Sequence, residues 1–282
     1  MKLKTRIIVD STADLVPEVK TRVYTVPLTV HFGQEEYVDG VTIDNKTFYE
    51  KLIESDVLPT TSQATPDAFM KEFEKARQAG EAAVVITLAS KFSGTYQSAM
   101  IAASDYENVY VVDGTSAAMG TGILVELAFR LLDRGMSAKE IAETLETEKE
   151  KIVVVALVDT LEYLKRGGRI SKASGAIGGL LGICPLLNMD NEGRLIPRFK
   201  IRTKKKVIKK IVDQMEENAE GGLSYSGKCY ISQSACYDDA RAVADLIEER
   251  FPNLNGKVEI NNIGTTIGSH TGPGTVALFF WG

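Results

Sequence analysis

Residues 82–105, AAVVITLASKFSGTYQSAMIAASD, decide the fold class. The run Ala82–Leu88 is apolar and rich in β-branched residues, so it predicts a buried strand. A helix is expected from about Gly94 to Asp105, and the loop between strand and helix is rich in hydroxyl groups. A buried strand that leads directly into a helix is typical of a parallel sheet with helices on both faces.

The same alternation extends to both sides of this segment. Arg6–Val9 and Val109–Val112 predict further buried strands. A second strand is expected over Val23–Phe32, where apolar residues recur at every second position. Thr65 and Pro66 are typical of the N-cap and first residue of a helix. Further helices are expected up to about residue 135 and over residues 137–151.

The pattern changes beyond Ile152–Val158, which predicts a central strand. The turn Asp190–Gly193 separates two apolar runs and indicates an antiparallel hairpin. A glycine-bearing helix is expected over Ile170–Leu181, and shorter helices and strands alternate to the end of the chain. We therefore expect an α/β protein with two domains. Residues 1–156 form an N-terminal parallel-sheet, Rossmann-like domain, and residues 157–282 form a C-terminal mixed-sheet domain.

Composition excludes several classes of protein. The chain has 282 residues, of which 44% are hydrophobic and 25% charged, as in ordinary globular proteins. Its net charge of −5 argues against a nucleic-acid-binding protein. The three cysteines have no zinc or disulfide spacing, so we expect no metal site. The uncharged run 173–189 contains glycines and a proline, so we expect no membrane span, and without a signal-peptide core the chain is expected to be cytoplasmic.

Three loops at strand ends carry hydroxyl groups: Asp10–Asp14, Pro59–Gln63 and Ser90–Ser98. Ligands of open α/β sheets bind at these ends. In the first loop the hydroxyls are expected to cap a helix that begins near Asp14. Ser93 and Gly94 precede a helix whose first turn favours an anion, although Ser93 also suits a plain helix cap.

The chain has only two histidines. His31 lies in a predicted strand and is expected to be structural. His270 lies in Ile267–Gly274, a segment with three glycines that we expect to be a loop. It suits a hydrogen bond to a carboxylate. A hydrolase that pairs Ser93 with His270 stays open as an alternative, since triad residues meet only in the fold, but no nucleophile elbow supports it.

One basic cluster stands out from the acidic background: Arg198, Lys200, Arg202, Lys204, Lys205, Lys206, Lys209 and Lys210. The first three share one face of a predicted strand, because side chains alternate along a strand. This cluster fits a dock for an acidic partner, and equally a plain solvated face.

Five segments, in order along almost the whole chain, resemble the DegV family of bacterial fatty-acid-binding proteins. They are Asp10–Leu15, Pro59–Gln63, Ser93–Ala99, Leu161–Ser171 and Ile267–Gly274. The resemblance implies two α/β domains around a buried acyl chain. It also implies a carrier, with no catalytic residue of its own, that presents the acid to a separate ATP-dependent fatty acid kinase.

The resemblance also implies residue roles. Thr61 and Ser93 match the residues that hold the carboxylate, and His270 matches a histidine close by. We therefore expect Thr61, Ser62, Ser93, Gly94 and His270 to bind the carboxylate, without any cofactor. The match of Arg202 implies kinase docking, with Lys200 and Lys204 as neighbours. Two residues depart from the family pattern: Gly114 replaces a serine or threonine, and Cys184 replaces a lysine.

The chemistry of a fatty acid agrees with hydroxyl donors. About fourteen methylenes at about 0.8 kcal/mol each offer roughly 11 kcal/mol on burial, before the cost of association. An ion pair is then unnecessary for tight binding. A second rival is a sugar or nucleotide binder that uses the same loops. It requires a polar pocket, whereas the carrier requires a long apolar one.

Overall fold

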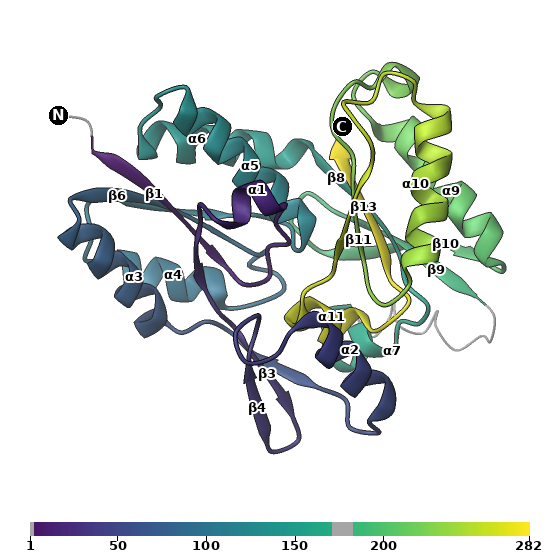
Figure 1. Ribbon diagram of the computed structural model, residues 1–282, viewed down its shortest axis with the longest axis horizontal. Helices are drawn as coiled ribbons and strands as arrows, with labels where there is room; N and C mark the ends of the chain where they lie inside the picture. Colours follow the sequence, from purple (N-terminus) through teal and green to yellow (C-terminus); the bar gives the residue numbers. More distant parts are fainter. Residues whose placement is uncertain (1–2, 171–182) are drawn as a thin grey trace.

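The computed structural model describes residues 3–170 and 183–282 (Figure 1). The first sheet has the order β2-β1-β6-β7, and all of its strands run parallel. The strands are β1 (Lys4–Asp10), β2 (Tyr24–Val26), β6 (Glu81–Thr87) and β7 (Val109–Asp113). The parallel α/β arrangement predicted from the sequence is therefore confirmed.

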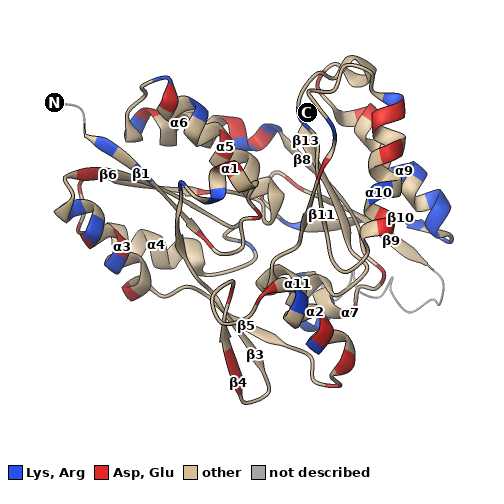
Figure 2. Cartoon of the chain, in the orientation of Figure 1, with Lys and Arg blue, Asp and Glu red and all other residues tan. Residues whose placement is uncertain are grey.

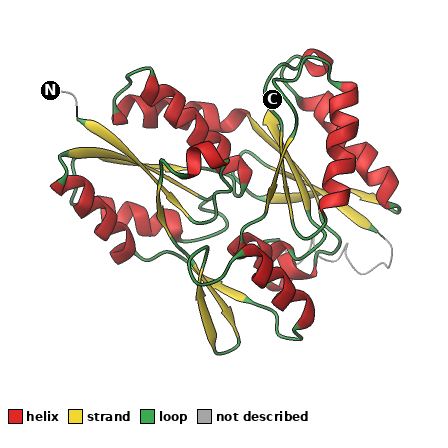
Figure 3. Ribbon diagram, viewed as in Figure 1, coloured by secondary structure: helices red, strands yellow, loops and turns green. Residues whose placement is uncertain are grey.

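Helices cover both faces of this first sheet (Figure 3). One face packs against α5 (Met119–Asp133) and α6 (Ala138–Glu148), and the other against α3 (Pro66–Gln78) and α4 (Thr95–Ala103). Side chains alternate along each strand, so Ile7 faces the first pair of helices and Ile8 the second. Burial on both faces explains why these strands are continuously apolar.

The second sheet is mixed and has the order β10-β9-β8-β13-β11-β12. Its strands are β8 (Ile152–Leu157), β9 (Cys184–Met189), β10 (Leu195–Ile201), β11 (Tyr230–Gln233), β12 (Glu259–Asn262) and β13 (Val276–Trp281). Helices α9 (Lys204–Asn218) and α10 (Tyr237–Arg250) cover one face. The other face turns toward the first sheet and its helix α5. The predicted hairpin is confirmed as the antiparallel pair β9–β10.

A small antiparallel sheet, β4-β3-β5, projects from the first sheet and its helices, which we call the first unit (Figure 1). It consists of β3 (Thr29–Phe32), β4 (Glu35–Val38) and β5 (Thr60–Ser62), and α2 (Asn45–Glu54) joins β4 to β5. Two short helices lie nearby, α7 (Glu162–Arg166) and α11 (Thr265–Thr271), and α11 packs against both α2 and α7. The remaining elements of the described residues are α1 (Pro17–Lys20), η1 (Lys149–Lys151) and η3 (Gly222–Ser224).

Two features of the chain before β4 differ from the sequence predictions. The strand expected over Val23–Phe32 is two strands, β2 and β3, in different sheets. Pro27 lies between them and has no N–H to donate to a ladder, so the chain changes sheet there. The helix expected to begin near Asp14 begins at Pro17, and no side chain caps it.

The domain boundary between residues 156 and 157 stays a prediction, but the strand pairing bears on it. It falls inside β8, which pairs along its length with β13 and also with β9 in the second sheet. Residues 152–156 therefore belong to the second sheet. The glycine-bearing helix expected over Ile170–Leu181 lies almost entirely outside the described residues. Within the described part, no helix is long and apolar enough to cross a membrane.

Candidate functional site

A cavity lies between the inner face of the second sheet and the strand-end loops of the first unit. Alternate residues of three neighbouring strands form its sheet wall, because side chains on one face of a strand are two residues apart. This sheet wall consists of Val154 and Ala156 from β8, Leu187 and Met189 from β9, and Ala277 and Phe279 from β13. All six are apolar, so the wall is suited to a hydrocarbon chain.

The same cavity also has a polar end. Thr61 of β5, Ser93 and Gly94 before α4, and His270 of α11 all line it. Arg169 lines it as well, which the sequence reasoning missed. The sequence places Arg169 directly after Gly167 and Gly168, which mark a turn that can aim its side chain.

Thr61 and His270 are in direct contact at this polar end. The distance from Thr61 Oγ1 to His270 Nε2 is 2.7 Å, although 209 residues separate them in the chain. Burial, and secondarily the charge of Arg169, lowers the pKa of His270 to about 4. The ring is therefore neutral near pH 7. Its Nδ1 has no hydrogen-bond partner among the described residues.

His270 lies on helix α11, and the prediction of a glycine-rich loop there is wrong. The glycines have other uses. A Cβ on Gly268 would lie 2.5 Å from the hydroxyl oxygen of Tyr49, so glycine permits the close approach of α11 to α2. Gly272 has a φ of +73° and ends the helix. The ring of His270 packs on a third glycine, since a Cβ on Gly167 would lie 2.2 Å from Nδ1.

Ser93 has a local partner in addition to its place in the cavity. Its Oγ lies 2.9 Å from Oγ1 of Thr95 and accepts a hydrogen bond from the Thr95 amide at 3.2 Å. Ser93 is therefore not the N-cap of α4, but its hydroxyl still accepts from the first amide of that helix. Gly94 is the N-cap of α4, and a Cβ there would lie 2.2 Å from Oε1 of Gln63. Glycine at this position therefore makes room for the Gln63 side chain.

Ser62 does not line the cavity, which corrects the expectation that it binds the carboxylate. It follows Thr61 on β5 and therefore points to the opposite side of the strand. The Ser62 side chain is exposed, and its hydroxyl lies 2.9 Å from Nε2 of His31. The two histidines of the chain thus contact neighbouring residues of one strand, from its two sides.

The loop Asp10–Asp14 has a role other than helix capping. Asp10 accepts hydrogen bonds from the amide and hydroxyl of Thr12 and from the amide of Leu88. Ser11 donates to Asp39. Burial is the main cause that raises the pKa of Asp10 to about 6 and of Asp14 to about 7. Asp10 and Ser11 thus join this loop to the segments of Leu88 and Asp39, and Asp14 joins it to Gly264 before α11. None of the residues Asp10–Asp14 lines the cavity.

The geometry does not assemble a hydrolase. Nucleophilic catalysis by serine requires a base within hydrogen-bond reach of the hydroxyl. Among the described residues, Ser93 bonds to Thr95, while His270 Nε2 bonds to Thr61. An apolar wall with a few hydroxyls at one end is instead typical of a site that binds an amphipathic ligand.

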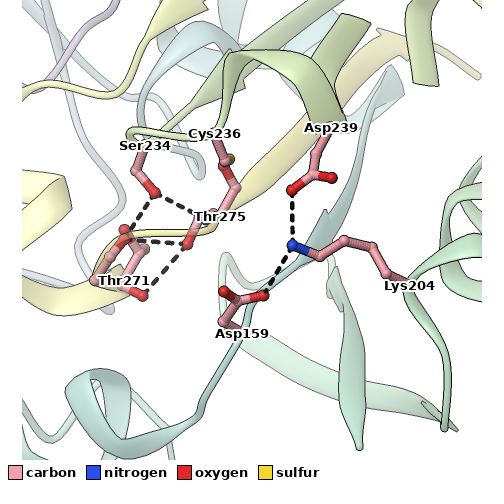
Figure 4. A network of polar contacts seen from close by, with 8 residues as sticks. Asp159, Lys204, Ser234, Cys236, Asp239, Thr271 and Thr275 are labelled. Carbon is pink, nitrogen blue, oxygen red and sulfur yellow. Dashed lines mark hydrogen bonds and ion pairs between the residues drawn. The ribbon is translucent and has the colours of Figure 1, made fainter. Parts of the chain in front are cut away.

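The predicted docking residues differ in their partners. Lys200 lies in β10, an edge strand of the second sheet, and Arg202 directly follows that strand. Both are exposed and form no ion pair with the described residues. Lys204 is bound instead: its Nζ lies 2.7 Å from Asp239 and 3.8 Å from Asp159 (Figure 4). Figure 2 shows further lysines at the start of α9, beside β10. Lys204 is therefore not a free cation of this surface.

Of the two departures from the family pattern, Gly114 has a local explanation and Cys184 has none. A Cβ on Gly114 would lie 2.5 Å from the carbonyl oxygen of Thr87, so this loop requires glycine. Cys184 is the first residue of β9 and is half-buried. Burial, and secondarily Asp159, raises the pKa of its thiol. Neither residue lines the cavity.

Comparisons with known proteins agree with this architecture. A DegV domain-containing protein from Clostridium perfringens is 34% identical, over 98% of this chain and 97% of the relative. A solved structure described as fatty acid binding of a DegV family protein from Thermus thermophilus has a TM-score of 0.89 and 32% identity, covering 98% of this chain and 99% of that one. The structure of DegV, a fatty acid binding protein from Bacillus subtilis, has a TM-score of 0.85 and 29% identity, covering 98% of both chains.

The family model described as "Uncharacterised protein, DegV family" matches residues 4–282. That range includes both large sheets, the cavity between them and every segment on which the sequence resemblance rested. The chain belongs to the DegV family.

Proposed function

We propose that this chain binds a long-chain fatty acid in the cavity, with the carboxylate at Thr61, Ser93, Gly94 and His270. One observation carries the proposal. A single cavity combines an apolar sheet face with one polar end, and that end lies at the N-terminus of helix α4. Such a cavity matches a ligand with a long hydrocarbon tail and one anionic head. The solved relatives from Thermus thermophilus and Bacillus subtilis are described as fatty-acid-binding proteins, which supports the same ligand class.

The polar end suits a carboxylate for three reasons. The first turn of α4 favours an anion through the dipole of the helix, although its first amide, that of Thr95, already donates to Ser93. Hydroxyl groups such as those of Thr61 and Ser93 donate hydrogen bonds that are worth about 1.5 to 3 kcal/mol each when the acceptor is charged. The guanidinium of Arg169 adds a positive charge, although it already donates to the carbonyl oxygens of Phe92 and Gly167.

His270 supports the head group through Thr61. If the neutral ring donates from Nε2 to Thr61 Oγ1, the Thr61 hydroxyl is free to donate to the carboxylate. The buried ring thus orients a donor without adding a charge of its own. This role requires no proton transfer and no covalent step, in agreement with a carrier rather than a catalyst.

The second part of the proposal is that the protein presents its fatty acid to a separate ATP-dependent fatty acid kinase, which forms the acyl phosphate. The family resemblance supports this part, together with Arg202 and Lys200, which are exposed and form no ion pair within residues 3–170 and 183–282 of an otherwise acidic protein. A concentrated basic surface attracts an acidic partner surface. Because Lys204 is bound by two carboxylates, Arg202 and Lys200 are the primary docking residues in this proposal.

Mass spectrometry of small molecules extracted from the purified protein tests the ligand class. We expect a stoichiometric long-chain fatty acid. A sugar or nucleotide in its place would contradict the proposal. Acyl-ester turnover by the purified protein, lost in His270→Ala, would revive the hydrolase alternative.

A further inference from the structure

Asp39 is a buried residue that brings three parts of the fold together. It follows β4, it is 4% exposed, and its carboxyl group accepts hydrogen bonds from three hydroxyl groups. Ser11, at the end of β1, donates to Oδ2 at 2.8 Å. Thr265 donates to Oδ1 at 2.6 Å, and Thr266 donates to Oδ2 at 2.7 Å. One side chain thus joins the first sheet, the small sheet and helix α11.

Both threonines lie in the first turn of α11, the helix that carries His270. Thr266 and His270 are four residues apart, so they lie on the same face of the helix, and both line the cavity. Thr265 is fully buried and does not line the cavity. Removing the Thr265 hydroxyl therefore tests the hydrogen bond to Asp39 without removing a contact with the ligand.

Other contacts hold the backbone of α11 at its two ends. The Asp14 carboxylate accepts from the amide of Gly264, just before the helix, at 3.1 Å. Beyond its other end, Ser234 donates to the carbonyl oxygen of Gly272 at 2.7 Å (Figure 4). These bonds fix where the helix begins and ends. The two threonine hydroxyls on Asp39 act through side chains, so they also set the rotation of α11 about its axis.

We infer that Asp39 is a positioning residue for the head-group site. It fixes the rotation of α11 through Thr265 and Thr266, and thereby holds the His270 ring against Thr61. The inference rests on the proposed function for its ligand, since the residue that Asp39 positions is one we place at the carboxylate. Asp39 itself does not line the cavity and would not touch the fatty acid.

Thr265 offers a matched test of the hydrogen bonds that hold α11 to Asp39. Thr265→Val removes the hydroxyl donor at nearly constant shape, whereas Thr265→Ser keeps the donor. Thr121→Val is the control, since Thr121 is equally buried and its hydroxyl has no hydrogen-bond partner in the described part of the chain. Each variant is labelled with ¹⁵N-histidine and delipidated, and its imidazole ¹⁵N resonances are recorded. The chain has only two histidines, so His31→Asn assigns both and the His31 signals serve as the internal reference.

We expect Thr265→Val to shift the His270 ring resonances while those of His31 stay in place. Affinity for palmitate, the probe, should fall about three- to tenfold, the size of one lost hydrogen bond. Thr265→Ser should restore both readouts, and Thr121→Val should change neither. A merely structural role would lower stability in Thr265→Val without moving the His270 signals.

The inference is overturned if folded Thr265→Val keeps the His270 resonances and palmitate affinity of the wild type. If Thr265→Val does not fold, Asp39→Asn gives the same readouts, because an amide has only one acceptor oxygen. If the wild-type protein does not bind palmitate, the proposed function fails. The ring resonances of unliganded protein then still decide whether Asp39 positions His270.

Discussion

The two ends of the cavity are built in different ways. The apolar wall comes from neighbouring strands of one sheet, in which every second residue faces inward. The polar end comes from four separate segments, which supply Thr61, Ser93, Arg169 and His270. Many side chains of the wall contact the same hydrocarbon chain in our proposal, so neighbouring side chains partly compensate for the loss of one. At the polar end each of these groups comes from a different segment, so no neighbour on the same strand compensates for its loss.

Replacing Thr61 and Ser93 together by alanine gives the largest expected effect. Hydrogen bonds to a charged acceptor are worth about 1.5 to 3 kcal/mol each, so affinity should fall by at least about a hundredfold. The loss should be equal for fatty acids of every chain length, because only the head group is affected. Isothermal titration over a series of chain lengths measures it.

Ser62→Ala is the matched control for the double variant. Ser62 is next to Thr61 in the chain but lies outside the cavity, so its replacement should leave affinity unchanged. Wild-type affinity in the double variant would remove the carboxylate from this end of the cavity.

The pH dependence of stability isolates the polar end in a second way. In the unfolded chain His270 gains a proton below pH 6.5, whereas in the folded protein its pKa is about 4. The unfolded state therefore binds more protons between these values, and this contribution to stability is lost as the pH falls from 6.5 to 4. The loss amounts to at most about 3 kcal/mol.

Comparison with His270→Gln extracts this contribution. Urea denaturation gives the free energy of unfolding of wild type and of the variant at each pH. The amount by which wild type exceeds the variant should decrease by about 3 kcal/mol as the pH falls from 6.5 to 4. Asp10 and Asp14 have raised pKa values, so their contributions to stability change in the opposite direction, decreasing as the pH rises toward 6 and 7. The variant retains both groups, so they cancel. A pH-independent difference would mean that the His270 ring is not shielded from solvent.

Ala277→Leu tests the apolar wall and should have a smaller effect. The larger side chain fills space that about two methylenes would occupy, so affinity for the longest acids should fall roughly tenfold. Acids too short to reach β13 should bind as before. A plot of affinity against chain length would then change slope, whereas the Thr61 and Ser93 variants shift the whole plot.

Leu278→Val is the control for Ala277→Leu. Leu278 is the next residue on β13 and packs against the helices of the other face, so it should affect stability and leave the slope alone. Equal losses at all chain lengths in Ala277→Leu would place Ala277 near the head group.

The contrast between the two ends also explains what the sequence could predict. The apolar wall belongs to strands with a clear pattern, and Ile152–Val158 and the β9–β10 hairpin were recognised from that pattern alone. Strand Val23–Phe32 was predicted as one element because its period of two continues across Pro27, which the chain uses to change sheet. Pattern describes a strand well, but it does not say which sheet the strand joins.

The polar end was harder to predict. Periodicity says nothing about which distant loops meet, so Thr61, Ser93 and His270 rested on the family resemblance, and Arg169 was missed. The prediction that Ser62 lies at the carboxylate was wrong, because adjacent residues of a strand face opposite ways and the sequence pattern does not show strand β5. The glycines around His270 predict a loop, because glycine is usually a sign of an irregular backbone. They instead permit close packing and end the helix.

Arg202→Ala should have the smallest effect on the cavity and a selective effect on the proposed kinase. Arg202 is exposed just after β10, so fatty-acid affinity should stay within about twofold of wild type, the usual range for surface substitutions. Acyl phosphate production with the kinase should fall, and the difference from wild type should shrink as salt is added, because exposed charges are screened over about 8 to 10 Å at ordinary ionic strength.

Lys204→Ala is the informative comparison. The Lys204 ammonium is already neutralised by Asp239 and Asp159, so its loss should impair the kinase reaction less. Both readings are taken on the same preparations, by lipid titration and by kinase-coupled turnover. Loss of lipid binding in Arg202→Ala would place this side chain at the cavity, and unchanged turnover would leave the basic cluster as a solvated face.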